Sequence, residues 1–241
     1  MLFPFLFLNP GRASAPLVVL LCWMVAPPLY GQSVGEPAGT AASLDERVLF
    51  GVYNIESPVF QGAMRSADAS AYPIFLGAPF ITWGSAWLLR GNGDFTDAYR
   101  LTLSQAATTG IVVGLKRLVR RPRPYAALSG ITARTSDATL GDSFSMPSGH
   151  ASTAFTLATS WSLSHDQWYV VVPSFVWAGS VALSRLWLGV HYPSDVLAGS
   201  LLGAAVGVGV HLLSPQITPG FLEKDEPERA LPMLHLRFAL P

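Results

Sequence analysis

The amino-acid sequence predicts an all-α helical bundle, a multi-pass membrane protein with about five to six transmembrane helices. Half of the 241 residues are hydrophobic, the mean hydropathy is +0.38, and only 12% are charged. A soluble domain usually carries about 25% charged residues. The formal net charge is zero, which gives no sign of a nucleic-acid partner, and the single cysteine, Cys22, excludes an intramolecular disulfide framework.

The N-terminal residues 1–31 have the layout of a targeting or membrane segment. Arg12 precedes the apolar run Leu17–Ala26, and small or turn-forming residues follow up to Gly31. This pattern predicts either a secretory signal peptide or an uncleaved first transmembrane helix, although the run is shorter than the ~20 residues of a typical span. Residues 32–43 are small and polar and are predicted to form a mobile segment.

Residues 44–213 are predicted to form the helical domain, and residues 214–241 a C-terminal tail. The domain begins with a mixed charged and apolar stretch, Leu44–Met64, which suggests an amphipathic helix on the membrane surface, interrupted near Pro58. Uncharged segments follow, each read as one helix of the bundle: Ala69–Leu89, Leu101–Leu115, Ala151–Ser164, Gln167–Ser184 and Val196–Leu213.

A soluble helical bundle is the alternative, because several of these segments are short and rich in serine and threonine. Two features favour the membrane. The segments Gln167–Ser184 and Val196–Leu213 have little polar surface to offer water. Gly199, Gly203 and Gly207 recur at a spacing of four, which lets helix backbones approach closely where no hydrophobic effect drives their association.

Three polar stretches interrupt this apolar chain, and the first is KRLVRRPRP, residues 116–124. Its cations follow the positive-inside rule for a helix end, or they form an anion site, since guanidinium groups bind phosphate oxygens in forked pairs. The five cations of this stretch are Lys116, Arg117, Arg120, Arg121 and Arg123.

The second stretch is SFSMPSGHAST, residues 143–153. Ser148 is a natural N-cap for the helix that follows, and the amides of such a helix end hold phosphate well. Gly149 removes a side chain where a ligand would approach the backbone. His150 is either an ordinary polar residue at a helix start or a functional one, because a positive helix end disfavours imidazolium.

The third stretch is SRLWLGVHYPSD, residues 184–195. Arg185 follows an apolar helix, where a charge is costly and usually functional. His191 and Asp195 straddle a loop-to-helix junction, which can bring the carboxylate to one ring nitrogen and leave the other free for attack. The plainer interpretation is a capping aspartate beside an unrelated histidine.

Together the three stretches closely resemble the signature of the type 2 phosphatidic acid phosphatase superfamily, which also includes bacterial acid phosphatases and vanadium haloperoxidases. All eleven signature positions match in order: Lys116, Arg123, Pro124, Pro147, Ser148, Gly149, His150, Ser184, Arg185, His191 and Asp195. The resemblance covers about Asp45 to Leu213. Outside the three motifs it rests only on the order of the helices.

The resemblance implies a role for each site residue. His191 would be the nucleophile that forms a phosphohistidine, Asp195 would orient it, and His150 would protonate the leaving oxygen and then help activate water. The phosphoryl oxygens would be held by Lys116, Arg123, Ser148, Gly149 and Arg185. No metal and no cofactor are required, since cations and amides already meet the developing charge.

The sequence therefore predicts a membrane phosphatase that acts on a lipid phosphate or diphosphate. Counting helix directions places all three stretches on one face, expected to be the periplasmic or exterior face of a bacterial inner membrane. A soluble secreted acid phosphatase of the same superfamily is the main alternative, and a vanadium-dependent haloperoxidase the next. A non-catalytic protein that binds anionic lipids through its basic stretch leaves His150 and the His191–Asp195 pair unexplained. The particular lipid and the oligomeric state are left open.

Overall fold

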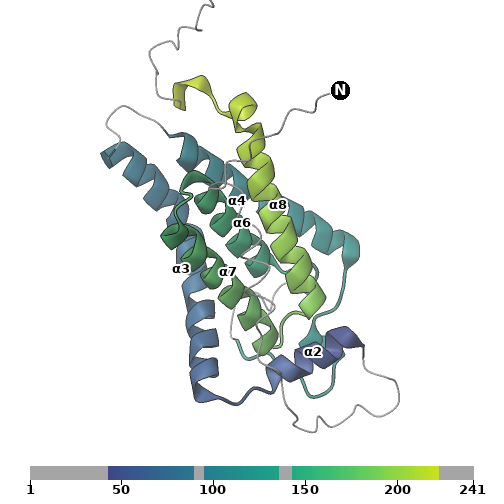
Figure 1. Ribbon diagram of the computed structural model, residues 1–241. Helices are drawn as coiled ribbons and strands as arrows, with labels where there is room; N and C mark the ends of the chain where they lie inside the picture. Colours follow the sequence, from purple (N-terminus) through teal and green to yellow (C-terminus); the bar gives the residue numbers. More distant parts are fainter. Residues whose placement is uncertain (1–42, 90–94, 136–142, 223–241) are drawn as a thin grey trace, which may run out of the picture.

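A computed structural model describes residues 43–89, 95–135 and 143–222. The predicted signal or membrane segment, residues 32–42 of the predicted mobile segment, and the tail beyond residue 222 lie outside these residues. The described chain contains helices and connections but no strand, which confirms the all-α prediction (Figure 1). The helices are α2 (Leu44–Tyr53), α3 (Pro58–Leu89), α4 (Thr96–Val119), α5 (Pro124–Ala127), α6 (Gly149–Ser164), α7 (Trp168–Trp187), α8 (Pro193–Ile217) and the 3-10 turn η2 (Gly220–Leu222).

Helix α6 is the centre of the bundle and packs against α3, α4, α7 and α8. Its residues from 150 to 160 are all buried except one, and serine and threonine are common among them. Their hydroxyls bond within the bundle, as Thr108 and Thr156 do at 2.7 Å, and Thr156 also donates to the Gly203 carbonyl at 3.1 Å. This position explains a helix that is short and rich in hydroxyls, because it faces other helices and not lipid.

The contact between α6 and α8 depends on the glycines spaced by four. A Cβ atom on Gly199 would lie 2.6 Å from the Ser148 carbonyl oxygen, and one on Gly203 would overlap the Ser152 carbonyl. The predicted close approach of helix backbones is thereby confirmed.

The N-terminal part of the domain differs from the prediction. The interruption near Pro58 is confirmed, but the residues from Pro58 to Met64 belong to α3, which runs on to Leu89 through two prolines. Pro79 has no amide hydrogen to donate to the Phe75 carbonyl, and the Gln105 side chain of α4 donates to it instead at 2.6 Å. Such a replacement from a neighbouring helix lets a helix continue past a proline, and no local pattern reveals it.

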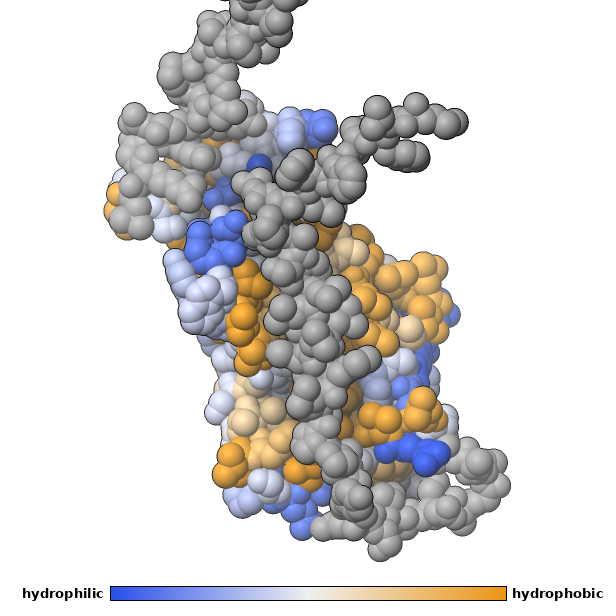
Figure 2. All heavy atoms as spheres, in the orientation of Figure 1, coloured by the Kyte–Doolittle hydropathy of each residue, from blue (hydrophilic) through white to orange (hydrophobic). Residues whose placement is uncertain are grey.

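Helices α7 and α8 are long and apolar enough to cross a membrane, by length and composition. Apolar side chains also cover the flank of the bundle, while hydrophilic ones gather towards its ends (Figure 2). The large apolar side chains that are at least 60% exposed all lie on helices: Leu44, Val59, Leu76, Phe80, Ile81, Trp87, Leu88, Leu118, Trp168, Tyr169, Leu201 and Leu212. The bundle is that of a membrane protein, and the predicted five to six spans remain a prediction.

Candidate active site

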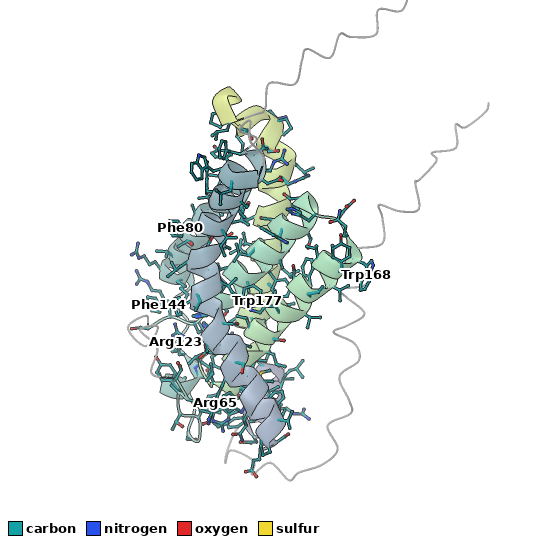
Figure 3. All side chains as sticks on the ribbon, turned by 90° about the vertical axis from the view of Figure 1, so that its left-hand side faces the viewer. Arg65, Phe80, Arg123, Phe144, Trp168 and Trp177 are labelled. Atoms are coloured by element: carbon teal, nitrogen blue, oxygen red, sulfur yellow. The ribbon has the colours of Figure 1, made fainter. Side chains whose placement is uncertain are left out.

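The three polar stretches meet at one end of the bundle, where α4 and α7 end and α6 and α8 begin. The Arg123 guanidinium donates to the Val190 carbonyl at 3.2 Å, which joins the first stretch to the third. The Ser148 amide donates to the Asp195 carbonyl at 3.0 Å, which joins the second to the third. Figure 3 places Arg123 beside Phe144 in the lower half of the bundle, far from Phe80.

His191 lies buried in the turn between α7 and α8, with its two ring nitrogens in different surroundings. Nε2 is 3.4 Å from a terminal nitrogen of the Arg123 guanidinium. Nδ1 is 3.7 Å from Oδ2 of Asp195, an ion-pair distance but too long for a hydrogen bond. One nitrogen therefore faces a carboxylate, as predicted, and the other faces a cation of the basic stretch.

Burial and charge keep His191 neutral. Burial lowers its pKa to about 3, and the Arg123 and Lys116 charges act in the same direction, whereas Asp195 opposes them. The imidazole is thus unprotonated at neutral pH, with a lone pair available for attack on an electrophile.

Asp195 caps a helix and also faces His191, the two placements that the sequence left as alternatives. It is buried in the first turn of α8, and its Oδ2 accepts the Tyr192 amide at 2.8 Å, which caps that helix. Its Oδ1 accepts a hydrogen bond from Arg121 at 2.9 Å. The same carboxylate faces His191, so capping and orientation of the histidine are compatible.

The start of α6 is built as the sequence predicts. Ser148 is the N-cap, and its hydroxyl accepts the Ala151 amide at 3.5 Å. A Cβ on Gly149 would meet only Val112 at an ordinary 3.6 Å. Packing therefore does not require glycine there, unlike at Gly199 and Gly203 of α8.

His150 is buried and lies against the aromatic side chains of α3. Its ring centroid is 5.0 Å from that of Tyr72 and 5.8 Å from that of Phe75. Its Nε2 atom is buried and has no hydrogen-bond partner among the described residues. A buried ring nitrogen of this kind is open to a ligand.

The remaining predicted phosphate ligands are cations held by protein oxygens. Lys116 donates to the Phe144 carbonyl at 2.9 Å. Arg185 is buried and forms an ion pair with Asp68 of α3. Asp68 was not among the predicted site residues, although a lone acid directly before the uncharged segment Ala69–Leu89 is an identifiable signal in a membrane helix.

The basic stretch divides into two sets of cations. Lys116 and Arg123 are buried at the site, and Arg121 is half-buried against Asp195, whereas Arg117 and Arg120 are exposed. Lys116 and Arg123 form the core of a candidate anion site, whereas Arg121 is bound to the carboxylates of Asp45 and Asp195. Arg117 and Arg120 are exposed and lie outside this candidate site, so the anion-site interpretation applies only to the buried cations of the stretch.

Among the described residues, no group of three or more His, Cys, Asp or Glu side chains is placed to hold a metal ion. The expectation that no metal or cofactor takes part stays a prediction. The positive groups that the site does contain are guanidinium, ammonium and a helix N-terminus, all of which suit a phosphate.

The chain belongs to the PAP2 superfamily, whose sequence profile matches residues 97–219. The matched region contains all three polar stretches and, apart from Thr96, the helices from α4 to α8. A search of curated proteins finds no match. The resemblance to the type 2 phosphatidic acid phosphatase superfamily is confirmed.

Two solved structures share the fold. LpxE from Aquifex aeolicus is 24% identical with a TM-score of 0.56, and the match covers 71% of this chain and 96% of that one. The first transmembrane PAP2-type phosphatidylglycerolphosphate phosphatase from Bacillus subtilis is 23% identical with a TM-score of 0.57, covering 86% and 99%. The second likeness extends well beyond the residues of the family profile.

Proposed function

We propose that the chain is an integral membrane phosphatase that hydrolyses a lipid phosphate or diphosphate monoester through a phosphohistidine on His191. The placement of the His191 ring carries this proposal. Nε2 lies 3.4 Å from the Arg123 guanidinium, while Nδ1 faces Asp195. A phosphoryl group bound to Arg123 would lie next to the nitrogen that can attack it.

The phosphoryl oxygens would be held by Lys116, Arg123 and Arg185, with the start of α6. The Ser148 amide is already bonded to Asp195, so its hydroxyl is the group left to reach a substrate. Gly149 leaves space beside the backbone for an oxygen to approach. These groups stabilise the negative charge of the transferring phosphoryl group, and the proposed reaction uses no metal or cofactor.

Two displacement steps complete the reaction. Nε2 of His191 attacks phosphorus, the bond to the lipid oxygen breaks, and His150 donates a proton to that oxygen. The negative charge of the bound substrate favours the protonated form of His150. Water then attacks the phosphohistidine, His150 accepts a proton from it, and inorganic phosphate leaves with His191 restored.

A lipid substrate is favoured over a soluble one by the surface of the bundle. Leucine, isoleucine, phenylalanine and tryptophan side chains are exposed along α3, α4 and α8. In a soluble acid phosphatase these apolar side chains would face water. The Bacillus subtilis neighbour is named for phosphatidylglycerolphosphate, so this lipid belongs among the substrates to test. Undecaprenyl diphosphate and phosphatidic acid are the other candidates.

The site is proposed to face the periplasm or the cell exterior of a bacterial inner membrane. An uncleaved first helix that enters from the cytoplasm and a cleaved signal peptide lead to the same orientation. Arg117 is exposed at the site end, so Arg117→Cys in a Cys22→Ser background reports sidedness. We expect a membrane-impermeant maleimide to label this cysteine in intact cells. Labelling only after lysis would show that the site faces the cytoplasm.

The proposed function is tested by phosphate release from detergent-purified wild type and His191→Ala. The panel contains undecaprenyl diphosphate, phosphatidylglycerophosphate, phosphatidic acid and a soluble aryl phosphate, all with EDTA present. We expect release from at least one lipid by the wild type only. Equal release by His191→Ala, or none from any substrate, would overturn the assignment.

A further inference from the structure

Helix α2 contributes a side chain to the end of the bundle that holds the candidate active site, the catalytic end. Asp45, in its first turn, accepts the Ser194 amide at 2.8 Å and the Ser194 hydroxyl at 2.5 Å. The other partner of Asp45 is Arg121, whose guanidinium lies 2.6 Å from Oδ2. Asp45 therefore ties α2 to the start of α8, directly beside Asp195.

Arg121 is held from several sides by protein groups. One terminal nitrogen donates to both Ser194 at 2.6 Å and Asp195 at 2.9 Å, and the other binds Asp45. The guanidinium carbon also lies 3.8 Å from the centre of the Tyr192 ring, a close cation–π contact. A guanidinium engaged in this way is poorly placed to bind phosphate.

The Asp195 carboxylate is fixed by two donors, one on each oxygen. Arg121 binds Oδ1, and the Tyr192 amide binds Oδ2. These bonds set the rotation of the carboxylate, which leaves Oδ2 as the atom facing His191. Without Arg121, Oδ1 would lose its donor and the carboxylate could turn about the Cβ–Cγ bond.

We propose that Arg121 and Asp45 are positioning residues for the reaction: Arg121 fixes and partly neutralises Asp195, and Asp45 holds Arg121 in place from α2. This inference rests on the proposed function. Neither residue touches the phosphoryl group, so their removal acts through Asp195 and His191. Helix α2 is then part of the catalytic apparatus and not only a helix on the membrane surface.

The charges around His191 predict the direction of a pH effect. The charged groups that influence it are Asp195 of α8, Arg123 before α5 and Lys116 of α4, with Arg121 acting through Asp195. Loss of Arg121 leaves the Asp195 charge uncompensated, which favours protonated His191 and raises its pKa. The acidic limb of the kcat/KM profile should move to higher pH, by about half a unit or more.

The test compares Arg121→Ala, Arg121→Lys and Asp45→Asn with Arg117→Ala, an exposed cation of the same stretch. We expect Arg121→Ala to lower kcat by about 10- to 100-fold with little change in KM. Arg121→Lys should recover only part of the loss, because an ammonium cannot bridge three partners as a planar fork does. Arg117→Ala should leave both kcat and the pH profile unchanged.

A double-mutant cycle separates positioning from simple docking of α2. Asp45→Asn should lower kcat in the wild-type background and have little further effect beside Arg121→Ala. Equal effects of Asp45→Asn on kcat in both backgrounds would overturn the inference. So would an Arg121→Ala variant whose kcat/KM falls while the acidic limb of its pH profile stays in place. A folded Arg121→Ala with wild-type kcat would also overturn it.

These failures are distinguishable from failure of the proposed function. If the wild type releases no phosphate, or if His191→Ala is as active as the wild type, the proposed function itself is wrong. If His191→Ala is inactive while Arg121→Ala and Asp45→Asn behave as the wild type, only the positioning role is wrong. Elution volume in detergent reports whether each variant is folded.

Discussion

The two ends of the bundle contain similar side chains in different environments. At the catalytic end, buried Asp195 binds half-buried Arg121, and buried Arg185 pairs with Asp68. At the opposite end, Asp97 lies 3.5 Å from Arg100, with about a quarter of each side chain exposed. Ion pairs of the second kind are screened by water and contribute ~0–1 kcal/mol, whereas a buried charge that loses its partner is costly.

The histidines differ in the same way. His191 is buried beside a guanidinium and His150 beside the rings of α3, whereas His165 stacks on Trp161 at a ring distance of 4.8 Å and is half-buried. The chain thus contains histidines, acids and arginines at both ends. What distinguishes the catalytic end is that its charges are removed from water around a histidine with an open nitrogen.

The largest contrast between the ends is expected for histidine substitutions. His150→Ala should lower kcat by about 10²–10⁴-fold, the usual contribution of a general acid or base. His165→Ala should leave phosphate release unchanged. Both effects are measured as steady-state rates of phosphate release from the preferred lipid. A comparable loss of rate in both variants would contradict the distinction between the two ends.

Within the basic stretch, position should matter more than charge. Arg123→Ala is expected to lower kcat/KM by about 10²–10³-fold, because one donor to the transferring phosphoryl group is removed. Arg117→Ala removes the same charge from the exposed surface and should have little effect. Equal losses measured in parallel would show that bulk charge explains the stretch.

Acids at the two ends should also differ. Asp68→Asn leaves the buried Arg185 without its half-buried counter-charge. Hydrogen bonds to charged groups contribute about 1.5–3 kcal/mol, so kcat/KM should fall about 10- to 100-fold. Asp97→Asn should change neither rate nor stability appreciably. The comparison is made on variants that elute as the wild type in detergent, and an unaffected Asp68→Asn would show that Arg185 is held by other groups.

A pair of glycines separates packing from chemistry at the catalytic end. Gly203→Ala inserts a methyl group into the Ser152 carbonyl and should lower stability by about 1–3 kcal/mol, as overpacking does. Gly149→Ala has room for its methyl group and should keep the wild-type Tm while lowering activity. Thermal denaturation in detergent measures the first effect, and a normal rate for Gly149→Ala would exclude close approach of a ligand there.

Much of the candidate site follows from local sequence. The spacing of Lys116 and Arg123, the cap at Ser148 and the His191–Asp195 junction are each contained within a dozen residues. The helices adjoining them are set by short-range hydrogen bonds and capping, which a single stretch reveals. The structure brings these stretches to one end, and their catalytic roles remain proposals.

The partners of these residues were not predictable in the same way. Arg121 and Asp45 are separated by 76 positions, and Arg185 lies on a different helix from Asp68. The continuation of α3 past Pro79 likewise depends on Gln105 of another helix. Each case requires contacts between distant segments, for which a single sequence holds no periodic signal.

The sequence by itself determined the all-α class, the positions of the apolar helices and the three stretches that match the PAP2 signature. These features depend on hydrophobicity, helix caps and residue spacing, which act over a few residues. Only the tertiary structure decided that α6 lies at the centre, that Asp68 pairs with Arg185, and that Asp45 and Arg121 hold Asp195. Burial and charge pairing are properties of the packed bundle, because desolvation depends on every helix that surrounds a side chain.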